Sequence, residues 1–74
     1  MTNIMNALGD LVFYLKFGRI SKEYFGFSPT WIYQRLGGKD GNGNPCEFTQ
    51  DQRAILKEAL HDVARKINAA ADKI

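Results

Sequence analysis

Two helix signals on either side of a glycine, in the middle of the chain, restrict the possible fold more than any other feature. Residues 20–25 have the composition of a short helix, and Gly26 would interrupt it, because glycine tolerates the left-handed conformation that ends helices. Ser28 and Pro29 mark the start of a second helix. Serine is a preferred N-cap, and proline fits the first helical position, where its missing N–H costs nothing. Residues 20–36 are therefore predicted to form two helices joined by a tight turn.

The second of these helices is predicted over residues 28–37. Phe27 and Ile32 stand at the hydrophobic-staple positions, which fix the direction in which a chain enters a helix. Gly37-Gly38 provides the stop. Trp31 can complete the core or lie flat at its edge, and we favour the core.

Helices are also expected at the two ends of the chain. In the N-terminal segment, apolar residues recur at spacings of three and four, which marks one face of a helix near residues 3–16. Thr2 or Asn3 can cap its start. Gly9 weakens its middle, and Gly18 is the expected stop. The apolar residues of this face are Ile4, Leu8, Leu11, Val12 and Leu15.

The C-terminal helix begins with a capping box, in which Thr49 is the N-cap and Gln52 stands three residues later. It is predicted to run over residues 49–72. Its apolar stripe is longer than a small domain needs, so the part from Ile55 to Val63 would cover the core and the rest would extend past it. We expect this overhanging end to form a homodimer interface, made of Ile67, Ala70, Ala71 and Ile74.

Length and composition place these helices in one small all-α domain, residues 1–74. Such a chain buries a modest core and often relies on a partner, a metal or disulfides. Cys46 is the only cysteine and His61 the only histidine, so neither an internal disulfide nor a structural zinc site is expected, and the pair lacks the third member of a catalytic set. The sequence shows neither a membrane span nor a signal peptide. We expect a cytoplasmic protein that is no enzyme and uses no cofactor or metal.

The glycine- and asparagine-rich connection from residue 37 to residue 45 favours turns, and a small hairpin or wing is one possibility. Within it, Asp40-x-Asn42-x-Asn44 resembles the first ligands of an EF-hand calcium loop. Pro45 replaces the required glycine, however, and Asp51 stands where a bidentate glutamate should be. A turn-rich loop without calcium is therefore expected.

The positive charge gathers around the two central helices. The formal net charge of the whole chain is +2. Residues 16–39 contain five basic side chains and one acidic side chain, which gives +4, whereas residues 1–15 and 40–74 each give −1. A concentrated basic patch suits a phosphate backbone, although charge clusters are often only solvated surface.

A helix, a tight turn and a second helix with polar side chains form the pattern of a helix-turn-helix, whose second helix enters the major groove of DNA. Ile32 and Leu36 would face the core, which leaves Thr30, Tyr33 and Gln34 on the outward side. A glutamine can pair with adenine, and a threonine can contact a thymine methyl. The residues expected to contact DNA are Ser28, Thr30, Tyr33, Gln34, Arg35, Lys39, Lys22 and Arg19.

The first helix of this unit departs from the usual form. Small residues normally occupy its middle, and only Ser21 meets that need. The bulky pair Tyr24-Phe25 before Gly26 also allows a turn that is one residue longer. The opposing interpretation is a plain three-helix packing in which the polar residues are merely solvated.

A resemblance to a protein family covers about residues 19–67. It rests on Tyr24-Phe25-Gly26-x-Ser28-x-x-Trp31-Ile32-Tyr33-Gln34-Arg35, followed by the glycine- and asparagine-rich loop, Pro45 and Phe48-Thr49. In these residues the chain resembles a family of short uncharacterised helix-turn-helix-like proteins of gut bacteria and their phages or mobile elements. The resemblance implies no established activity, and in similar chains a longer segment precedes the motif.

These patterns favour a small DNA-binding protein, a transcriptional regulator that reads the major groove of double-stranded DNA with the helix of residues 28–37. The alternative is a protein-interaction module of a phage or mobile element that binds no DNA. That module would use the aromatic surface around Tyr14, Phe17, Tyr24 and Tyr33.

Overall fold

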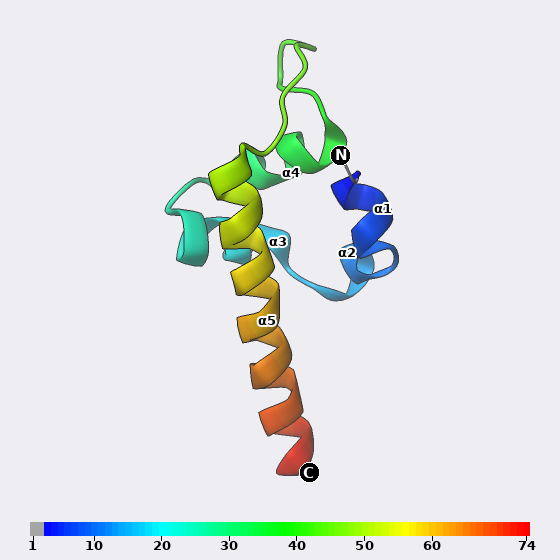
Figure 1. Ribbon diagram of the computed structural model, residues 1–74, viewed down its shortest axis with the longest axis vertical. Helices are drawn as coiled ribbons and strands as arrows, with labels where there is room; N and C mark the ends of the chain where they lie inside the picture. The colour runs from blue at the N-terminus through cyan, green and yellow to red at the C-terminus, as the bar shows by residue number, and fades with distance from the viewer. Residues whose placement is uncertain (1–2) are drawn as a thin grey trace.

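The computed structural model describes residues 3–74, and the all-α prediction is confirmed (Figure 1). The long helix α5 lies along the longest dimension of a molecule that measures 45 × 24 × 23 Å, and the other elements surround its first half. In chain order the elements are α1 (Ile4–Leu8), α2 (Leu11–Tyr14), α3 (Phe17–Ile20), the π-helix η1 (Ser21–Phe25), α4 (Pro29–Gly37) and α5 (Gln50–Asp72).

The core draws on helices from both ends of the chain. Phe17 of α3 and Ile32 of α4 have no exposed surface. Burial of one large apolar side chain contributes about 1.5–3 kcal/mol to the free energy of unfolding. The buried side chains therefore supply much of the stability of a chain this short. The other buried apolar residues are Leu8, Ile20, Leu36, Phe48, Leu56 and Ala59.

The N-terminal prediction of one helix over residues 3–16 is wrong, because the segment is divided into α1 and α2. Gly9 adopts φ +54° and ψ −131°, a conformation outside the helical region, and it ends α1. Leu15 is extended and ends α2. The expected cap is present at Asn3, whose side-chain oxygen accepts the Met5 amide at 2.9 Å, whereas Thr2 lies outside the described residues.

The predicted stop at Gly18 is also wrong, because this glycine lies inside α3. The helix expected at residues 20–25 begins earlier, at Phe17, and α3 continues directly into η1. Packing explains the difference: a Cβ atom added to Gly18 would come within 2.9 Å of the Cβ atom of Pro29. The predicted break at Gly26 is confirmed, since this residue has φ +73°.

The boundaries of α4 agree with the prediction. Pro29 is its first residue, and Gly38, with φ +81°, follows its last residue and donates to the carbonyl of Gln34 at 2.9 Å. Trp31 is only half-buried and packs against the core from its edge. Its ring lies against that of Phe27, with centroids 4.6 Å apart. Phe27, which precedes the N-cap, therefore packs on Trp31, whereas the predicted staple partner is Ile32.

The connection between α4 and α5 folds as a small hairpin, one of the two forms expected. Lys39 and Pro45 form an antiparallel bridge. The Asp40 carboxylate accepts the amides of Asn44 at 2.9 Å and Asn42 at 2.8 Å, and these hydrogen bonds lower the pKa of Asp40. In residues 3–74, no group of three or more His, Cys, Asp or Glu side chains could hold a metal ion.

Helix α5 begins with the predicted capping box. Thr49 Oγ1 accepts the Gln52 amide at 3.1 Å, and Gln52 Oε1 accepts the Thr49 amide at 2.9 Å. The division of its apolar stripe is also confirmed, because Val63 is the last residue packed on the core and residues 64–74 are exposed. The prediction that the core-facing part begins at Ile55 is wrong. Ile55 is exposed, and the next residue, Leu56, is the one buried in the core.

Neither α5 nor any other helix within the described residues combines the length and the apolar character that crossing a membrane requires.

Candidate nucleic-acid interface

The contact between α3–η1 and the start of α4 determines how the predicted recognition residues are presented. We call residues 17–37 the corner. Gly18 allows the close approach of Pro29, and the fully buried Ser21 donates a hydrogen bond from Oγ to the Ser28 carbonyl at 2.7 Å. Residues three positions apart lie on the same side of a helix. The two small residues therefore form one surface on which α4 begins.

The N-cap and the first two turns of α4 present polar side chains to solvent. Ser28, Thr30 and Tyr33 are exposed. Ser28 has the extended conformation of an N-cap, but its hydroxyl makes no capping hydrogen bond. Lys22 follows Gly18 by four residues, so it lies on the side of the first helix that faces Pro29, and it too is exposed. These residues form the α4 N-terminal surface: Lys22, Ser28, Thr30 and Tyr33.

Arg19 is exposed, lines a pocket with Val63 and Lys66 of α5, and is paired within its own helix. Its Nε atom donates to Glu23 Oε1 at 2.8 Å, and this hydrogen bond and charge raise the pKa of Arg19. The pair is open to water, with side-chain exposures of 75% for Arg19 and 44% for Glu23, so it contributes little to stability. It does reduce the net positive charge that Arg19 brings to the corner.

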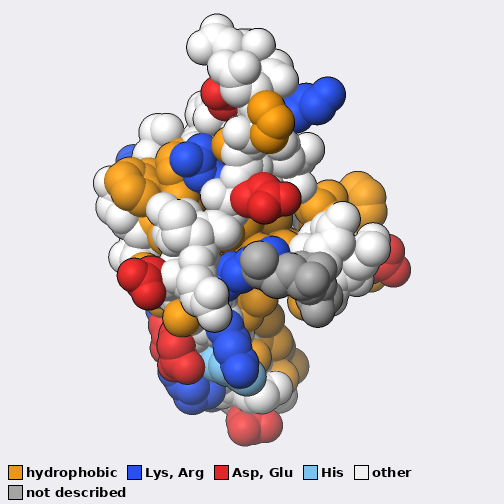
Figure 2. Space-filling model, turned by 45° about the horizontal axis from the view of Figure 1, so that its top comes forward, with side chains coloured by type: hydrophobic (Ala, Val, Ile, Leu, Met, Phe, Trp, Pro, Cys, Tyr) orange, Lys and Arg blue, Asp and Glu red, His pale blue; other side chains and the backbone are white. Residues whose placement is uncertain are grey.

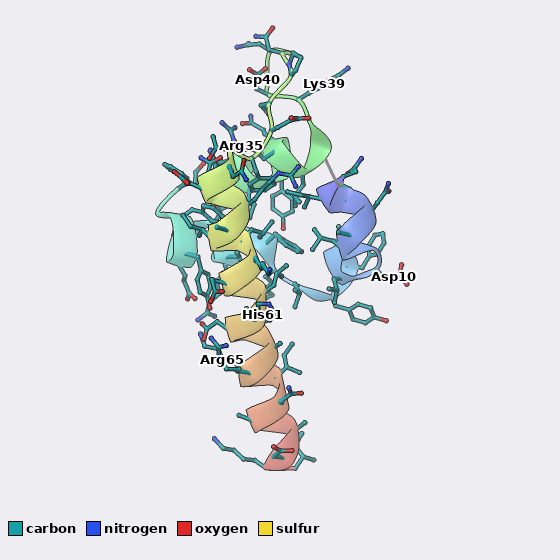
Figure 3. The ribbon with its side chains drawn as sticks, viewed as in Figure 1. Asp10, Arg35, Lys39, Asp40, His61 and Arg65 are labelled. Atoms are coloured by element: carbon teal, nitrogen blue, oxygen red, sulfur yellow. The ribbon has the colours of Figure 1, made fainter. Side chains whose placement is uncertain are left out.

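Gln34 and Arg35 are turned toward other parts of the protein. The side chain of Gln34 is half-buried, and its Nε2 would lie 3.6 Å from a Cβ atom added to Gly41 in the hairpin. The guanidinium carbon of Arg35 lies 4.9 Å from the Trp31 ring centroid. Lys39 extends outward from the base of the hairpin (Figure 3). The eight predicted residues therefore do not form one continuous surface.

Basic side chains are also mixed with acidic ones on the face drawn in Figure 2, which shows no single continuous basic field. The excess of +4 along residues 16–39 does not form one basic surface at the start of α4, because Arg35 lies over Trp31 and Lys39 extends outward from the hairpin. Electrostatic attraction of a polyanion would accordingly depend on a few local cations.

A hydrogen-bonded cluster joins η1 and α5, and only part of it could be predicted from the sequence. The Tyr24 hydroxyl donates to Asp62 Oδ2, and Lys66 Nζ lies 3.4 Å from both the Asp62 carboxylate and the Tyr24 oxygen. The Asp62–Lys66 pairing follows from their four-residue spacing. The contribution of Tyr24 depends on tertiary packing 38 residues away in sequence, for which the sequence holds no local signal.

Cys46 and His61, the two residues considered for catalysis, have different surroundings. Cys46 donates from Sγ to the Gln34 carbonyl at 3.4 Å and is half-buried beneath the hairpin. His61 is exposed on α5 (Figure 3).

Two groups of exposed apolar side chains away from the corner bear on possible protein contacts. The end of α5 presents Ile67, Ala70, Ala71 and Ile74 to solvent. On α2, Phe13 and Tyr14 are 86% and 80% exposed. The aromatic surface expected for a protein-interaction module is different from this, because Phe17 is fully buried and Tyr24 is half-buried against Asp62.

The described residues thus define a small all-α chain with a tightly packed helical corner and a projecting C-terminal helix. The chain belongs to the family of the domain of unknown function DUF5053, whose model matches residues 4–74. Comparison with curated proteins and comparison with solved structures each gave no match.

Proposed function

We propose that this protein is a transcriptional regulator that binds double-stranded DNA with the start of α4. The α4 N-terminal surface supports the proposal, because it exposes Ser28, Thr30 and Tyr33 together at the beginning of a helix. In a helix-turn-helix, the N-terminal residues of the second helix contact base edges. The free hydroxyl of Ser28 and the cation of Lys22 are suited to phosphate oxygens.

The corner geometry gives a second line of support. A helix-turn-helix requires small residues where its two helices meet, and Gly18 and Ser21 both meet the start of α4. Arg19 and Lys39 are exposed as well and would add phosphate contacts. Gln34 and Arg35 are not part of the proposed surface, because Gln34 is directed toward the hairpin and Arg35 lies over the Trp31 ring.

The proposed regulator is a cytoplasmic homodimer joined through the end of α5. One corner contacts only a few base pairs, and symmetric readers increase their affinity by contacting two half-sites. The exposed side chains of Ile67, Ala70, Ala71 and Ile74 support this arrangement, because a second copy could cover them. No catalytic step is part of the proposal.

The proposal is tested by measuring binding to a random-sequence duplex, with fluorescence anisotropy as the readout, at 50 and 200 mM salt. Counterion release predicts a steep loss of affinity between these concentrations, by about tenfold or more when several phosphates are contacted. The double variant Lys22→Gln, Thr30→Ala should bind more weakly. The matched control is Lys73→Gln, which removes the same charge at the opposite end of the molecule (Figure 1). Absence of binding at 50 mM salt would refute DNA binding.

A second candidate function is protein interaction through α2, favoured by the exposure of Phe13 and Tyr14. It would not require the α4 N-terminal surface. The variant Phe13→Ser, Tyr14→Ser should leave duplex binding unchanged if the DNA proposal is correct. Duplex binding that disappears in this variant, with the helical content retained, would contradict the location we propose for the DNA site.

A further inference from the structure

A cavity of about 450 Å³ lies where α1, the end of α4 and the start of α5 meet. Its volume falls in the range of small-molecule pockets, which are roughly 300–1,000 Å³. Leu36 and Phe48, both buried in the core, form part of its lining, and Met5 contributes a flexible apolar side chain. Arg35 of α4 and Arg53 of α5 reach the same cavity from different helices. The lining therefore combines apolar surface with converging positive charge.

The guanidinium group of Arg35 is held in place, and one of its donors, the Nε atom, lacks an acceptor within the described residues. This Nε atom is buried. The stacking on Trp31 at 4.9 Å fixes the guanidinium group over the ring. A buried donor without an acceptor costs free energy, which an acceptor in the cavity would recover.

The nearest acidic group does not serve as that acceptor. The charge of Arg35 contributes to the lowered pKa of Asp40, after the hydrogen bonds from Asn44 and Asn42. Both amides nevertheless bond to the same Asp40 oxygen and keep the carboxylate within the hairpin turn. Figure 3 shows Asp40 in the hairpin and Arg35 beside the start of α5. Glu47 also lines the cavity.

We propose that this cavity binds a small organic anion, in which a carboxylate or phosphate group is attached to an apolar body. The anionic group would accept hydrogen bonds from Arg35, whose planar guanidinium suits a carboxylate or phosphate. The apolar body would contact Leu36, Phe48 and Met5. The site is distinct from the α4 N-terminal surface, because it lies at the other end of α4. Its occupant would contact α1, the end of α4 and the start of α5 together.

Thermal unfolding of the full chain, without DNA, tests this site with two defined probes, benzoate and phenyl phosphate. At constant ionic strength, at least one probe should raise the melting temperature along a saturable curve, since a ligand that binds only the folded state stabilises it. Inorganic phosphate and chloride serve as comparison salts. Equal shifts with the comparison salts, or no shift with either probe, would overturn the proposal.

Calorimetric titration of variants assigns the binding to Arg35. Arg35→Gln should weaken the affinity for the probe by about tenfold or more, because a charged hydrogen-bond donor is lost. Arg35→Lys keeps the charge but removes the planar fork, so it should also bind more weakly. Lys57→Gln, an exposed change of equal charge on α5, should bind like the unaltered chain. Circular dichroism confirms that each variant is folded. Unaltered affinity in both Arg35 variants would remove the site from this cavity.

Discussion

Ser21 is the one polar residue buried among residues 3–74, and its hydroxyl joins the two helices of the corner at the carbonyl of Ser28. One turn earlier, Gly18 leaves room for Pro29, because it has no Cβ atom. Sequence reasoning recognised the small size of Ser21 but assigned Gly18 to a helix end. A glycine that ends a helix and a glycine that admits a neighbouring residue look the same in the sequence, because only the packing partner distinguishes them.

Replacing Ser21 with alanine should destabilise the fold by about 1 kcal/mol, because the Ser28 carbonyl loses a hydrogen bond at a buried position. Denaturant unfolding measures the change. Ser28→Ala is the matched control: its hydroxyl makes no capping bond, so its free energy of unfolding should stay within about 0.5 kcal/mol. The control should instead weaken duplex binding. If Ser28→Ala is the more destabilising of the two, our account of this contact is wrong.

At the scale of elements, the helix starts with local signals could be predicted. Pro29 and the Thr49–Gln52 capping box fix the beginnings of α4 and α5 through bonds and dihedral angles within four residues. The division of the N-terminal segment could not be predicted in this way. A glycine inside an amphipathic pattern costs about 1 kcal/mol in a continuous helix, and tertiary packing decides whether the helix continues or ends.

Gly18→Ala should destabilise the packing of α3 on α4 by about 1–3 kcal/mol, because the added Cβ atom would meet the Cβ atom of Pro29 at 2.9 Å. Gly37→Ala is the opposite case, since Gly37 has open space around its Cβ position and no positive φ. It should stabilise the protein by up to about 1 kcal/mol through helix propensity. Thermal unfolding compares the two. A neutral Gly18→Ala would show that the helices separate without cost.

The Tyr24–Asp62 hydrogen bond makes the contact between η1 and α5 sensitive to pH. This bond, together with the charge of Lys66, lowers the pKa of Asp62 below 3.8. The stabilisation is therefore complete above about pH 4 and is lost as the pH falls through the lower pKa of the folded state. The same bond raises the pKa of Tyr24 above 10.0, so its contribution is lost only in stronger alkali.

Tyr24→Phe should raise the pKa of the Asp62 carboxyl and reduce the loss of stability below pH 4. NMR titration of Asp62 and unfolding at pH 2–7 measure these two effects. Tyr33→Phe is the control, because Tyr33 is exposed and no hydrogen bond of its hydroxyl is found among residues 3–74. An Asp62 pKa that does not move in Tyr24→Phe would show that the charges of Lys66 and Arg65 control it.

At the scale of the whole molecule, the fold could be predicted better than the candidate site. Helical periodicity and caps depend on neighbours in sequence, and they led to the all-α class and the overhang of α5. The site depends on side-chain direction. Arg35 and Gln34 have the chemistry to contact DNA, but Trp31 and the hairpin hold them elsewhere. Composition alone carries no information about such competing partners.

Truncation after Val63 should convert the proposed dimer to a monomer, because it removes all four residues of the predicted interface. Light scattering at several concentrations measures the mass. The matched point variants are Ile67→Glu, which places a charge within the interface, and Asn68→Glu, which places it on the next residue around the helix. Dimerisation should be lost in the first and retained in the second. A mass that is the same for the full and truncated chains would exclude this interface.

The projection of α5 beyond the core has a geometric consequence if it joins two copies. An α-helix rises 1.5 Å and turns 100° per residue, so the length of the overhang would fix both the separation and the relative rotation of the two corners. Half-sites on one face of a duplex lie about 34–36 Å apart, or at multiples of that spacing. An insertion after Val63 would be present in both copies, so one added residue would turn each corner by about 100° relative to the joined helix ends, whereas seven would nearly restore the orientation at a larger span. The length of the overhang would thus determine which separation of DNA half-sites the dimer can bind.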